Sequence, residues 1–192
     1  MTAMTAGILL AAGAGRRFGG PKALVEIDGE PMVLRALRAL REGTVDPVLV
    51  VVGAHAAEVS ALLAGATAVV INPDWDEGMS SSLRAGLNAV ERLDPRPDAV
   101  LLHLVDLPWV GAEAVRRLSA VAGPEVIARA AYDGVPGHPV VIGREHWAAV
   151  AAGATGDKGA RSWLAGRSDV LLVECGDIAR GQDVDTPADL ER

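Results

Sequence analysis

The strongest constraint on this chain is a glycine-rich loop near its N-terminus. The loop follows an apolar stretch of β-strand character and reads Ala12-Gly13-Ala14-Gly15-Arg16-Arg17-Phe18-Gly19-Gly20-Pro21-Lys22. Glycine permits sharp turns and lets backbone N–H groups approach a ligand closely. Arg16, Arg17 and Lys22 add three positive charges, which suit phosphate oxygens. The sequence therefore predicts a triphosphate-binding loop directly after the first strand.

Two better-known phosphate-binding loops do not fit this segment. A P-loop requires Gly-Lys followed by Ser or Thr, whereas Gly20 is followed by Pro21 and Lys22, with no hydroxyl for magnesium. A dinucleotide-binding fingerprint requires a third glycine where this chain has Phe18. An ordinary turn between a strand and a helix is the remaining alternative, but it does not require the Arg-Arg and Pro-Lys pairs.

Composition narrows the class of protein further. With 192 residues, 50% of them hydrophobic and 22% charged, we expect one folded domain spanning residues 1–192 rather than a disordered chain. The net charge of -7, without a basic block, argues against nucleic acid or an anionic membrane as a partner. Cys175 is the single cysteine, which excludes an intrachain disulfide and a thiolate metal cluster. The N-terminal residues resemble neither a secretory signal nor a membrane span, so we expect a cytoplasmic protein.

Apolar runs of strand length alternate with helical patterns along the chain. The runs are continuous, as expected for strands that are covered on both faces. This alternation predicts an α/β fold, a three-layer α/β/α sandwich with a mostly parallel, Rossmann-like sheet. In such sheets ligands bind beyond the carboxyl ends of the strands. The predicted strands are 8–11, 48–52, 68–71, 99–105, 126–131, 140–142 and 170–173, and the predicted helices are 31–42, 58–63, 81–93, 112–121, 145–152 and 158–164.

Asp106 follows the buried apolar run 99–105 and precedes Leu107 and Pro108. A carboxylate at the end of a buried strand is costly unless something compensates its charge, and a magnesium ion held with a triphosphate would do so. The alternative is that Asp106 accepts hydrogen bonds from N–H groups of a turn or of the helix near Ala112.

A second acidic segment lies near the C-terminus. Asp183 and Asp185 point to the same side if the backbone is extended, so both can reach one cation, and the sequence does not choose between them. Thr186 and Pro187 then open a short helix, with Thr186 as the N-cap and Asp189 completing a partial capping box.

Gly78 and the three serines Ser80 to Ser82 lead into the helix predicted over 81–93. Small hydroxyl groups near a helix N-terminus suit the edge of a base or a phosphate. An N-cap with spare hydroxyls is the plain structural alternative.

The first loop, written L-A-A-G-x-G-x-R-x-G-x-x-K from Leu10 to Lys22, resembles the signature of nucleotidyltransferases. The resemblance is to the branch that contains molybdenum cofactor cytidylyltransferase and the related guanylyltransferase. The signature arginine and lysine fall on Arg17 and Lys22. Gly15 stands where the family often has Ser, and Phe18 where it usually has Met. The resemblance implies that Asp106 is a magnesium ligand and that the segment with Asp183 and Asp185 supports a second ligand.

Three further segments resemble the same branch. Asn72 to Leu83 resembles the element N-x-x-W-x-x-G-M-x-x-S-L, which lies near the base, and it makes Ser82 the best base-contacting residue. Gly137-His138-Pro139 and the segment from Gly156 to Arg161 resemble elements that face the acceptor molecule. The resemblance therefore implies acceptor binding by His138, Lys158 and Arg161.

The resemblance implies an Mg²⁺-dependent transfer of CMP from CTP to the phosphate of molybdopterin, with release of pyrophosphate. Such a phosphate is already an anion near pH 7, so no general base is needed. Arg17, Lys22 and Asp106 would be the catalytic residues. Alternatives are a guanylyl or sugar-phosphate nucleotidyltransferase, and a non-catalytic nucleotide-binding chaperone for a molybdoenzyme. The implied nucleotide-binding residues are Leu10, Ala11, Ala12, Gly13, Gly15, Arg16, Arg17, Lys22, Gly78 and Ser82.

Within that branch, the sequence Leu-Ala-Ala-Gly at residues 10–13 favours the cytidylyl members, because the guanylyl members usually have Leu-Ala-Gly-Gly. Ala12 against the base also suits the smaller pyrimidine ring. Val105-Asp106-Leu107-Pro108 departs from the common Asp-Gln-Pro of the branch, and this leaves the identity of the acceptor open.

Overall fold

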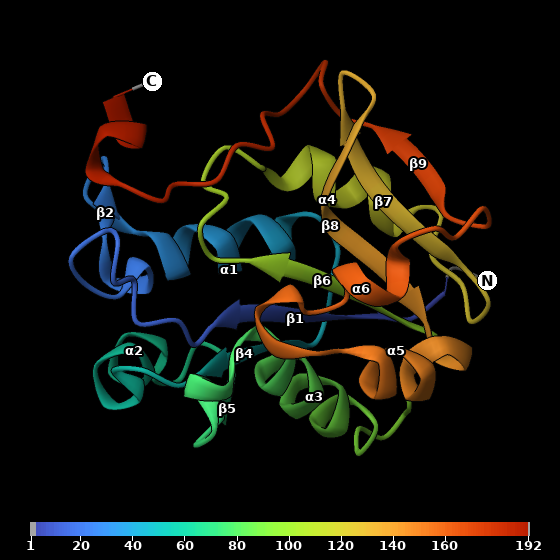
Figure 1. The fold of residues 1–192 in the computed structure, drawn as a ribbon, viewed down its shortest axis with the longest axis horizontal. Coiled ribbons are helices and arrows are strands. Elements are labelled where there is room, and N and C mark those ends of the chain that lie inside the picture. The colour runs from blue at the N-terminus through green and yellow to red at the C-terminus, as the bar shows by residue number, and fades with distance from the viewer. Residues whose placement is uncertain (1–2, 192) are drawn as a thin grey trace.

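A computed structural model describes residues 3–191 and shows a twisted seven-stranded sheet with helices on both faces (Figure 1). The strand order is β5-β4-β1-β6-β8-β7-β9, and a small hairpin pairs β2 with β3. The strands are β1 (Thr5–Ala11), β2 (Glu26–Ile27), β3 (Glu30–Pro31), β4 (Val48–Val52), β5 (Ala68–Ile71), β6 (Ala99–Leu104), β7 (Ile127–Tyr132), β8 (Val135–Gly143) and β9 (Leu171–Glu174). The helices are α1 (Met32–Glu42), α2 (Ala56–Leu63), α3 (Met79–Val90), α4 (Ala112–Ser119), α5 (Trp147–Gly153) and α6 (Arg161–Leu164).

The predicted sheet is confirmed as mostly parallel. β1 pairs in parallel with β4 and β6, β4 with β5, and β7 with β9. β8 runs antiparallel to both β6 and β7. Its direction follows from a tight hairpin at Asp133 and Gly134, whose φ angles of 52° and 79° suit the right-handed twist of the two strands.

The boundary of one predicted strand was wrong. Residues 140–142 were expected to form a strand, but β8 begins at Val135 and contains Gly137-His138-Pro139. The turn is the Asp133-Gly134 pair directly before Val135. The predicted helix 158–164 is also shorter, because Gly156–Lys158 forms a single 3-10 turn before α6.

The continuous apolar runs reflect two buried cores, one on each face of the sheet. Leu9 and Ala11 of β1 pack on the side of α1 and α4, whereas Ile8 and Leu10 pack on the side of α3 and α5. Each fully buried leucine or isoleucine stabilises the fold by about 1.5–3 kcal/mol. Both faces of the central strands therefore need apolar residues, and an alternating pattern would not fit.

α3 lies unusually close to the sheet because it contains Gly86. A Cβ atom at Gly86 would lie 2.7 Å from Cγ2 of Ile8. The close approach sets the N-terminal end of α3 beside the carboxyl end of β1.

The carboxyl ends of β1 and β6 lie side by side, and the C-terminal segment crosses the same edge (Figure 1). Buried Val184 fixes this crossing, because its N–H donates to the carbonyl of Asp106 at 2.9 Å. Three segments distant in the sequence therefore meet at one edge of the sheet. None of the helices in the described part of the chain is long and apolar enough to cross a membrane.

Candidate active site

The glycine-rich loop after β1 closes on the carbonyl of Gly15. This carbonyl accepts hydrogen bonds from the N–H groups of Phe18, Gly19 and Gly20 at 3.0, 3.0 and 3.1 Å. Gly15 has a φ of 60°, and a Cβ atom there would lie 1.8 Å from the carbonyl oxygen of Gly20. The loop therefore needs glycine at this position.

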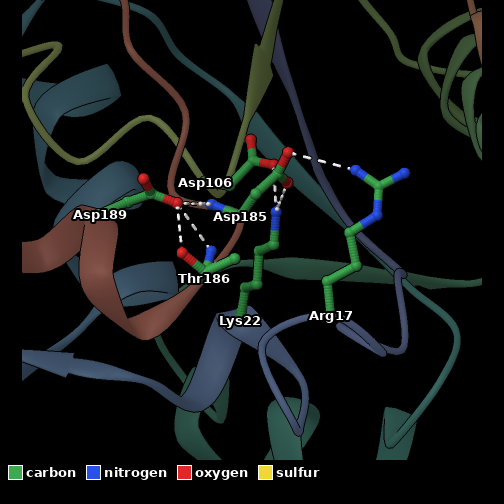
Figure 2. Close-up of polar contacts among 6 residues, drawn as sticks. All are labelled: Arg17, Lys22, Asp106, Asp185, Thr186 and Asp189. Atoms are coloured by element: carbon green, nitrogen blue, oxygen red, sulfur yellow. Dashed lines mark hydrogen bonds and ion pairs between the residues drawn. The ribbon is translucent and has the colours of Figure 1, made fainter.

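The loop directs Lys22 toward two carboxylates from distant parts of the chain (Figure 2). Lys22 Nζ donates to Asp185 Oδ1 at 2.6 Å and to Asp106 Oδ2 at 3.0 Å. Arg17 reaches the same group from the solvent side, with its Nη1 3.5 Å from Asp185 Oδ2. Cationic and acidic site residues therefore lie together, as expected from the sequence.

Asp106, Asp183 and Asp185 form a cluster in which one carboxylate oxygen from each lies within 4.8 Å of the other two. The buried side chain of Val184 separates Asp183 from Asp185 and anchors the segment to the backbone of Asp106. Oδ1 of Asp106 is buried and has no hydrogen-bond partner among the described residues. Three carboxylates at this spacing, one of them with an unsatisfied oxygen, fit a hard divalent cation such as Mg²⁺ or Mn²⁺.

The pKa values of the cluster reflect its burial. Burial raises the pKa of Asp106 above its ordinary value, Lys22 opposes the rise, and the charge of Asp183 adds to it. Burial alone would lower the pKa of Lys22, but hydrogen bonds to Asp185 and Asp106 and their charges outweigh it, so the pKa is raised. Lys22 is therefore charged, and further positive charge beside Asp106 would favour its ionised form.

Of the expected capping box at the C-terminal 3-10 turn, Pro187–Glu191, the contact from Asp189 back to Thr186 is confirmed (Figure 2). Asp189 Oδ2 accepts hydrogen bonds from Thr186 N at 2.8 Å and from Thr186 Oγ1 at 2.9 Å. Asp189 Oδ2 also accepts a hydrogen bond from Asp185 N at 3.2 Å, and this bond holds the backbone of Asp185, a candidate metal ligand.

A cavity of about 400 Å³ opens beside this cluster. All ten residues that the sequence assigned to nucleotide binding line it, together with Asp106 and Asp185. The other lining residues include Trp75, Asp76 and Asp157, which were not among the predicted site residues. Trp75 also packs over Gly53: a Cβ atom added at Gly53 would lie 2.3 Å from the Cβ atom of Trp75.

Buried Asn72 orders the start of α3. Its Nδ2 donates to Ser81 Oγ at 2.8 Å and to Ser82 Oγ at 3.0 Å. Ser81 Oγ in turn donates to the carbonyls of Asp74 and Gly78 at 2.8 and 2.9 Å, so it ties the preceding loop to the first turn of α3. The expected N-cap by one of these serines is wrong, because α3 begins at Met79 and Gly78 is its N-cap residue. Ser82 lines the cavity, and none of the described residues accepts its hydroxyl proton.

Gly78 explains how Asp157 reaches the cavity. Gly78 has a φ of 104°, and a Cβ atom there would lie 2.6 Å from Asp157 Oδ1 and 2.7 Å from the backbone of Gly156. The glycine therefore admits the 156–158 turn against the start of α3. In the sequence, the contact between Gly78 and the 156–158 turn is marked only by a glycine in each segment. Such a glycine does not by itself reveal a long-range contact.

His138, Lys158 and Arg161 do not line this cavity but line a smaller one of about 40 Å³ beside it. Leu10 and Leu104 are common to both cavities. Burial, aided by the charges of Arg129 and Arg161, lowers the pKa of His138 to about 4, so its imidazole is neutral at pH 7. Tyr132 Oη fixes the backbone of His138 by donating to its carbonyl at 2.6 Å.

Comparisons with known proteins agree with this geometry. The sequence model of one family, described as MobA-like NTP transferase domain, matches residues 7–171. The match includes the glycine-rich loop and Asp106 and ends before Asp183. Nicotine blue oxidoreductase of Paenarthrobacter nicotinovorans is 37% identical, over 97% of this chain and 94% of its own length. The 2-C-methyl-D-erythritol 4-phosphate cytidylyltransferase of Streptomyces avermitilis is 34% identical, over 70% of this chain and 52% of its own.

Among solved structures, Rv0371c from Mycobacterium tuberculosis H37Rv superposes with a TM-score of 0.83 and 30% identity, covering 100% of this chain and 98% of that one. A structure described as the complex of Rv0371c with manganese matches with a TM-score of 0.76 and 29% identity, covering 94% of both chains. The predicted fold is confirmed, and one structural relative is described as a complex with a divalent metal, manganese.

Proposed function

This chain belongs to the family of MobA-like NTP transferase domains, and on that premise we propose that it transfers CMP from CTP to the phosphate of molybdopterin, with Mg²⁺. One observation carries the proposal: a single cavity is lined by the glycine-rich loop, by Arg16, Arg17 and Lys22, and by Asp106 and Asp185 of the acidic cluster. A triphosphate needs the first two, and its metal ion needs the third.

Each part of the proposed site has a defined task. The loop N–H groups, Arg17 and Lys22 bind the phosphates that leave as pyrophosphate, and Arg16 adds charge at the rim. Asp106, with Asp183 or Asp185, holds the Mg²⁺, which neutralises phosphate charge when bound. Ser82 contacts the base, and its position in the cavity supports that role.

The reaction needs no proton transfer. An oxygen of the acceptor phosphate forms a bond to the α-phosphorus of CTP, while the bond from that phosphorus to the oxygen bridging toward the β-phosphorus breaks. The pyrophosphate leaves with the electron pair, and its charge is neutralised by Arg17 and Lys22. Catalysis therefore consists of in-line positioning and charge stabilisation.

Two observations lead us to propose CTP, and not GTP, as the nucleotide substrate. Ala12 lines the cavity and leaves less room for a purine than glycine would. The relative from Streptomyces avermitilis is named as a cytidylyltransferase, although this chain spans only about half of its length.

A second candidate function comes from the relative from Paenarthrobacter nicotinovorans, which is named as an oxidoreductase. On that alternative the same cavity would take a redox nucleotide. The loop lacks the third glycine of the dinucleotide fingerprint, and the carboxylate cluster has no evident task in hydride transfer. We therefore place this candidate second.

The deciding experiment measures pyrophosphate release with CTP, GTP, UTP and ATP plus Mg²⁺, with and without molybdopterin, and with Asp106→Asn as the inactive control. Release that requires both CTP and molybdopterin supports the proposal. Release with GTP assigns the guanylyl alternative, and CTP binding without release favours a nucleotide-binding chaperone for a molybdoenzyme. Oxidation of NADH or NADPH by a quinonoid dye, unaffected by Asp106→Asn, would support the oxidoreductase.

A further inference from the structure

The small cavity beside the nucleotide site contains a cation that the sequence assigned to no role. Arg129 lies on β7 and lines this cavity together with Arg161 and Lys158. Residues alternate across the sheet, so Arg129 points to the same face as Ile127, the face covered by α3, α5 and α6. Three cationic side chains therefore meet in one small pocket of a chain whose net charge is -7.

The two guanidinium groups have no acidic partner to neutralise them. Within residues 3–191, no carboxylate oxygen lies within 4.0 Å of a guanidinium nitrogen of Arg129 or Arg161. Arg129 is half-buried, and its Nε donates only to the carbonyl of Gly137, at 3.3 Å. By contrast, Arg38, Arg117 and Arg144 all pair with carboxylates. A partly buried charge without an acidic partner is costly, so an anion beside Arg129 would be favoured.

The electrostatics of the pocket point the same way. Burial and the nearby charge of Arg161 lower the pKa of Arg129. His138 is neutral at pH 7 and adds no charge, but its imidazole can donate or accept a hydrogen bond. Two like charges held close together favour whatever anion can bridge them.

The size of the pocket limits what it can hold. A volume of about 40 Å³ suits a carboxylate or a phosphate oxygen group and excludes a heterocycle. Leu10, Met79, Leu104 and Asp157 line both cavities, so a molecule in the larger cavity can extend an anionic group into the smaller one.

We infer that Arg129 and Arg161 together bind an anionic group of the acceptor, a carboxylate or a phosphate, and so select acceptors that carry one. The inference rests on the proposed function, because it takes the second substrate of that reaction as the ligand. Arg129 is then a specificity-determining residue on a strand that the nucleotide does not require. The triphosphate is held separately by the loop with Arg17 and Lys22.

The test observes the arginine Nε–H signals of the full chain by NMR while inorganic phosphate or acetate is added. Titrations are run with and without saturating CTP and Mg²⁺, which block the triphosphate loop. We expect the Arg129 and Arg161 signals to shift in both cases, and the stronger-binding anion to identify the acceptor group. The absence of any shift at Arg129 with either anion would overturn the inference.

Variants separate this site from the nucleotide site. Arg129→Gln and Arg161→Gln should each weaken phosphate affinity roughly ten- to hundredfold, while CTP affinity stays unchanged. Arg161 is exposed, so its variant remains informative if Arg129→Gln fails to fold, and Arg92→Gln is a surface control that should change neither. Loss of CTP affinity in both pocket variants would assign the guanidinium groups to the nucleotide and contradict the inference. Failure of the wild-type protein to bind CTP would instead contradict the proposed function, and the Arg129 response would still decide the anion site.

Discussion

Lys22 and Asp185 lie 163 positions apart, yet Lys22 Nζ is 2.6 Å from Asp185 Oδ1 (Figure 2). The same ammonium group lies 3.0 Å from Asp106 Oδ2. Both carboxylates belong to the cluster that fits a divalent cation. Lys22 and a metal ion therefore draw on the same carboxylates, and the positive charge of Lys22 opposes a second cation there.

This competition gives a prediction for Lys22→Met. Without nucleotide, the variant should bind Mn²⁺ several-fold more tightly than the wild type, because a competing positive charge has been removed. Pyrophosphate release should nevertheless fall by about 10²–10³-fold, since the leaving group loses a stabilising charge. Electron paramagnetic resonance measures the Mn²⁺ affinity. Arg16→Met is the matched control, and an unchanged or weaker Mn²⁺ affinity in Lys22→Met would contradict the prediction.

Asp183 and Asp185 should differ in their effect on nucleotide binding. Asp185 also holds Lys22 and Arg17, whereas no ion pair of Asp183 is present among the described residues. Asp183→Asn should therefore weaken Mn²⁺ binding and leave metal-free CTP binding intact. Asp185→Asn should change both, because Lys22 and Arg17 lose the group that positions them. Calorimetric titration of each variant with Mn²⁺ and with CTP in a chelator checks this, and equal effects of the two variants on CTP would refute it.

Much of this site could be predicted because most of its residues belong to short sequence motifs that directly follow predicted strands. The continuous apolar runs fixed the parallel strands, and the carboxyl ends of such strands lie at one edge. The loop with Arg17 and Lys22 and the acid Asp106 both follow strands, so their meeting could be expected. Asp183 and Asp185 do not directly follow a predicted strand, so only the family resemblance placed them beside Asp106.

Other parts of the site depend on contacts that leave no local pattern. Arg129 lies inside an apolar run, and only the packing of α6 on the face of the sheet that carries Ile127 places it in a pocket with Arg161. Asp157 enters the nucleotide cavity because Gly78, in a distant motif, lacks a Cβ atom. The antiparallel direction of β8 was encoded in the Asp133-Gly134 pair, which was not identified as a hairpin turn from the sequence.

Gly15→Ala should disrupt the phosphate-binding loop. The added Cβ would meet the carbonyl oxygen of Gly20 in a backbone with a φ of 60°, so the loop must open. We expect a loss of about 1–3 kcal/mol in the free energy of unfolding and a marked loss of CTP affinity. Gly20→Ala is the matched control, because no atom lies within 4 Å of its added Cβ. Urea unfolding and CTP titration compare the two, and a Gly15→Ala loop that binds CTP normally would refute the assignment.

Ser81 and Ser82 should separate folding from nucleotide selection. Ser81→Ala removes the hydroxyl that donates to the carbonyls of Asp74 and Gly78, and should cost about 1 kcal/mol of stability. Ser82→Ala should cost less stability but reduce the preference for CTP over UTP by roughly 2- to 10-fold. Thermal unfolding and competitive nucleotide binding give the two readouts. A Ser82→Ala variant with unchanged selectivity would remove Ser82 from the base site.

His138 should make the fold sensitive to acid. Its folded pKa is about 4, whereas the ordinary value is 6.5, because burial and the charges of Arg129 and Arg161 disfavour the imidazolium. Between these values the unfolded chain takes up a proton that the folded chain does not, so this stability is present above pH 6.5 and is lost as the pH falls toward 4. Fully buried His103, whose pKa is lowered to about 3, acts in the same direction.

Replacement by an uncharged side chain isolates the contribution of His138. Between neutral pH and about pH 5, wild-type protein should lose roughly 2 kcal/mol more of its unfolding free energy than His138→Gln. Urea unfolding at both pH values gives this difference, and it cancels the common effect of the carboxyl groups and of His103. Parallel pH curves for the two proteins would mean that the imidazole is solvated in the folded state, and that Arg129 and Arg161 do not face it.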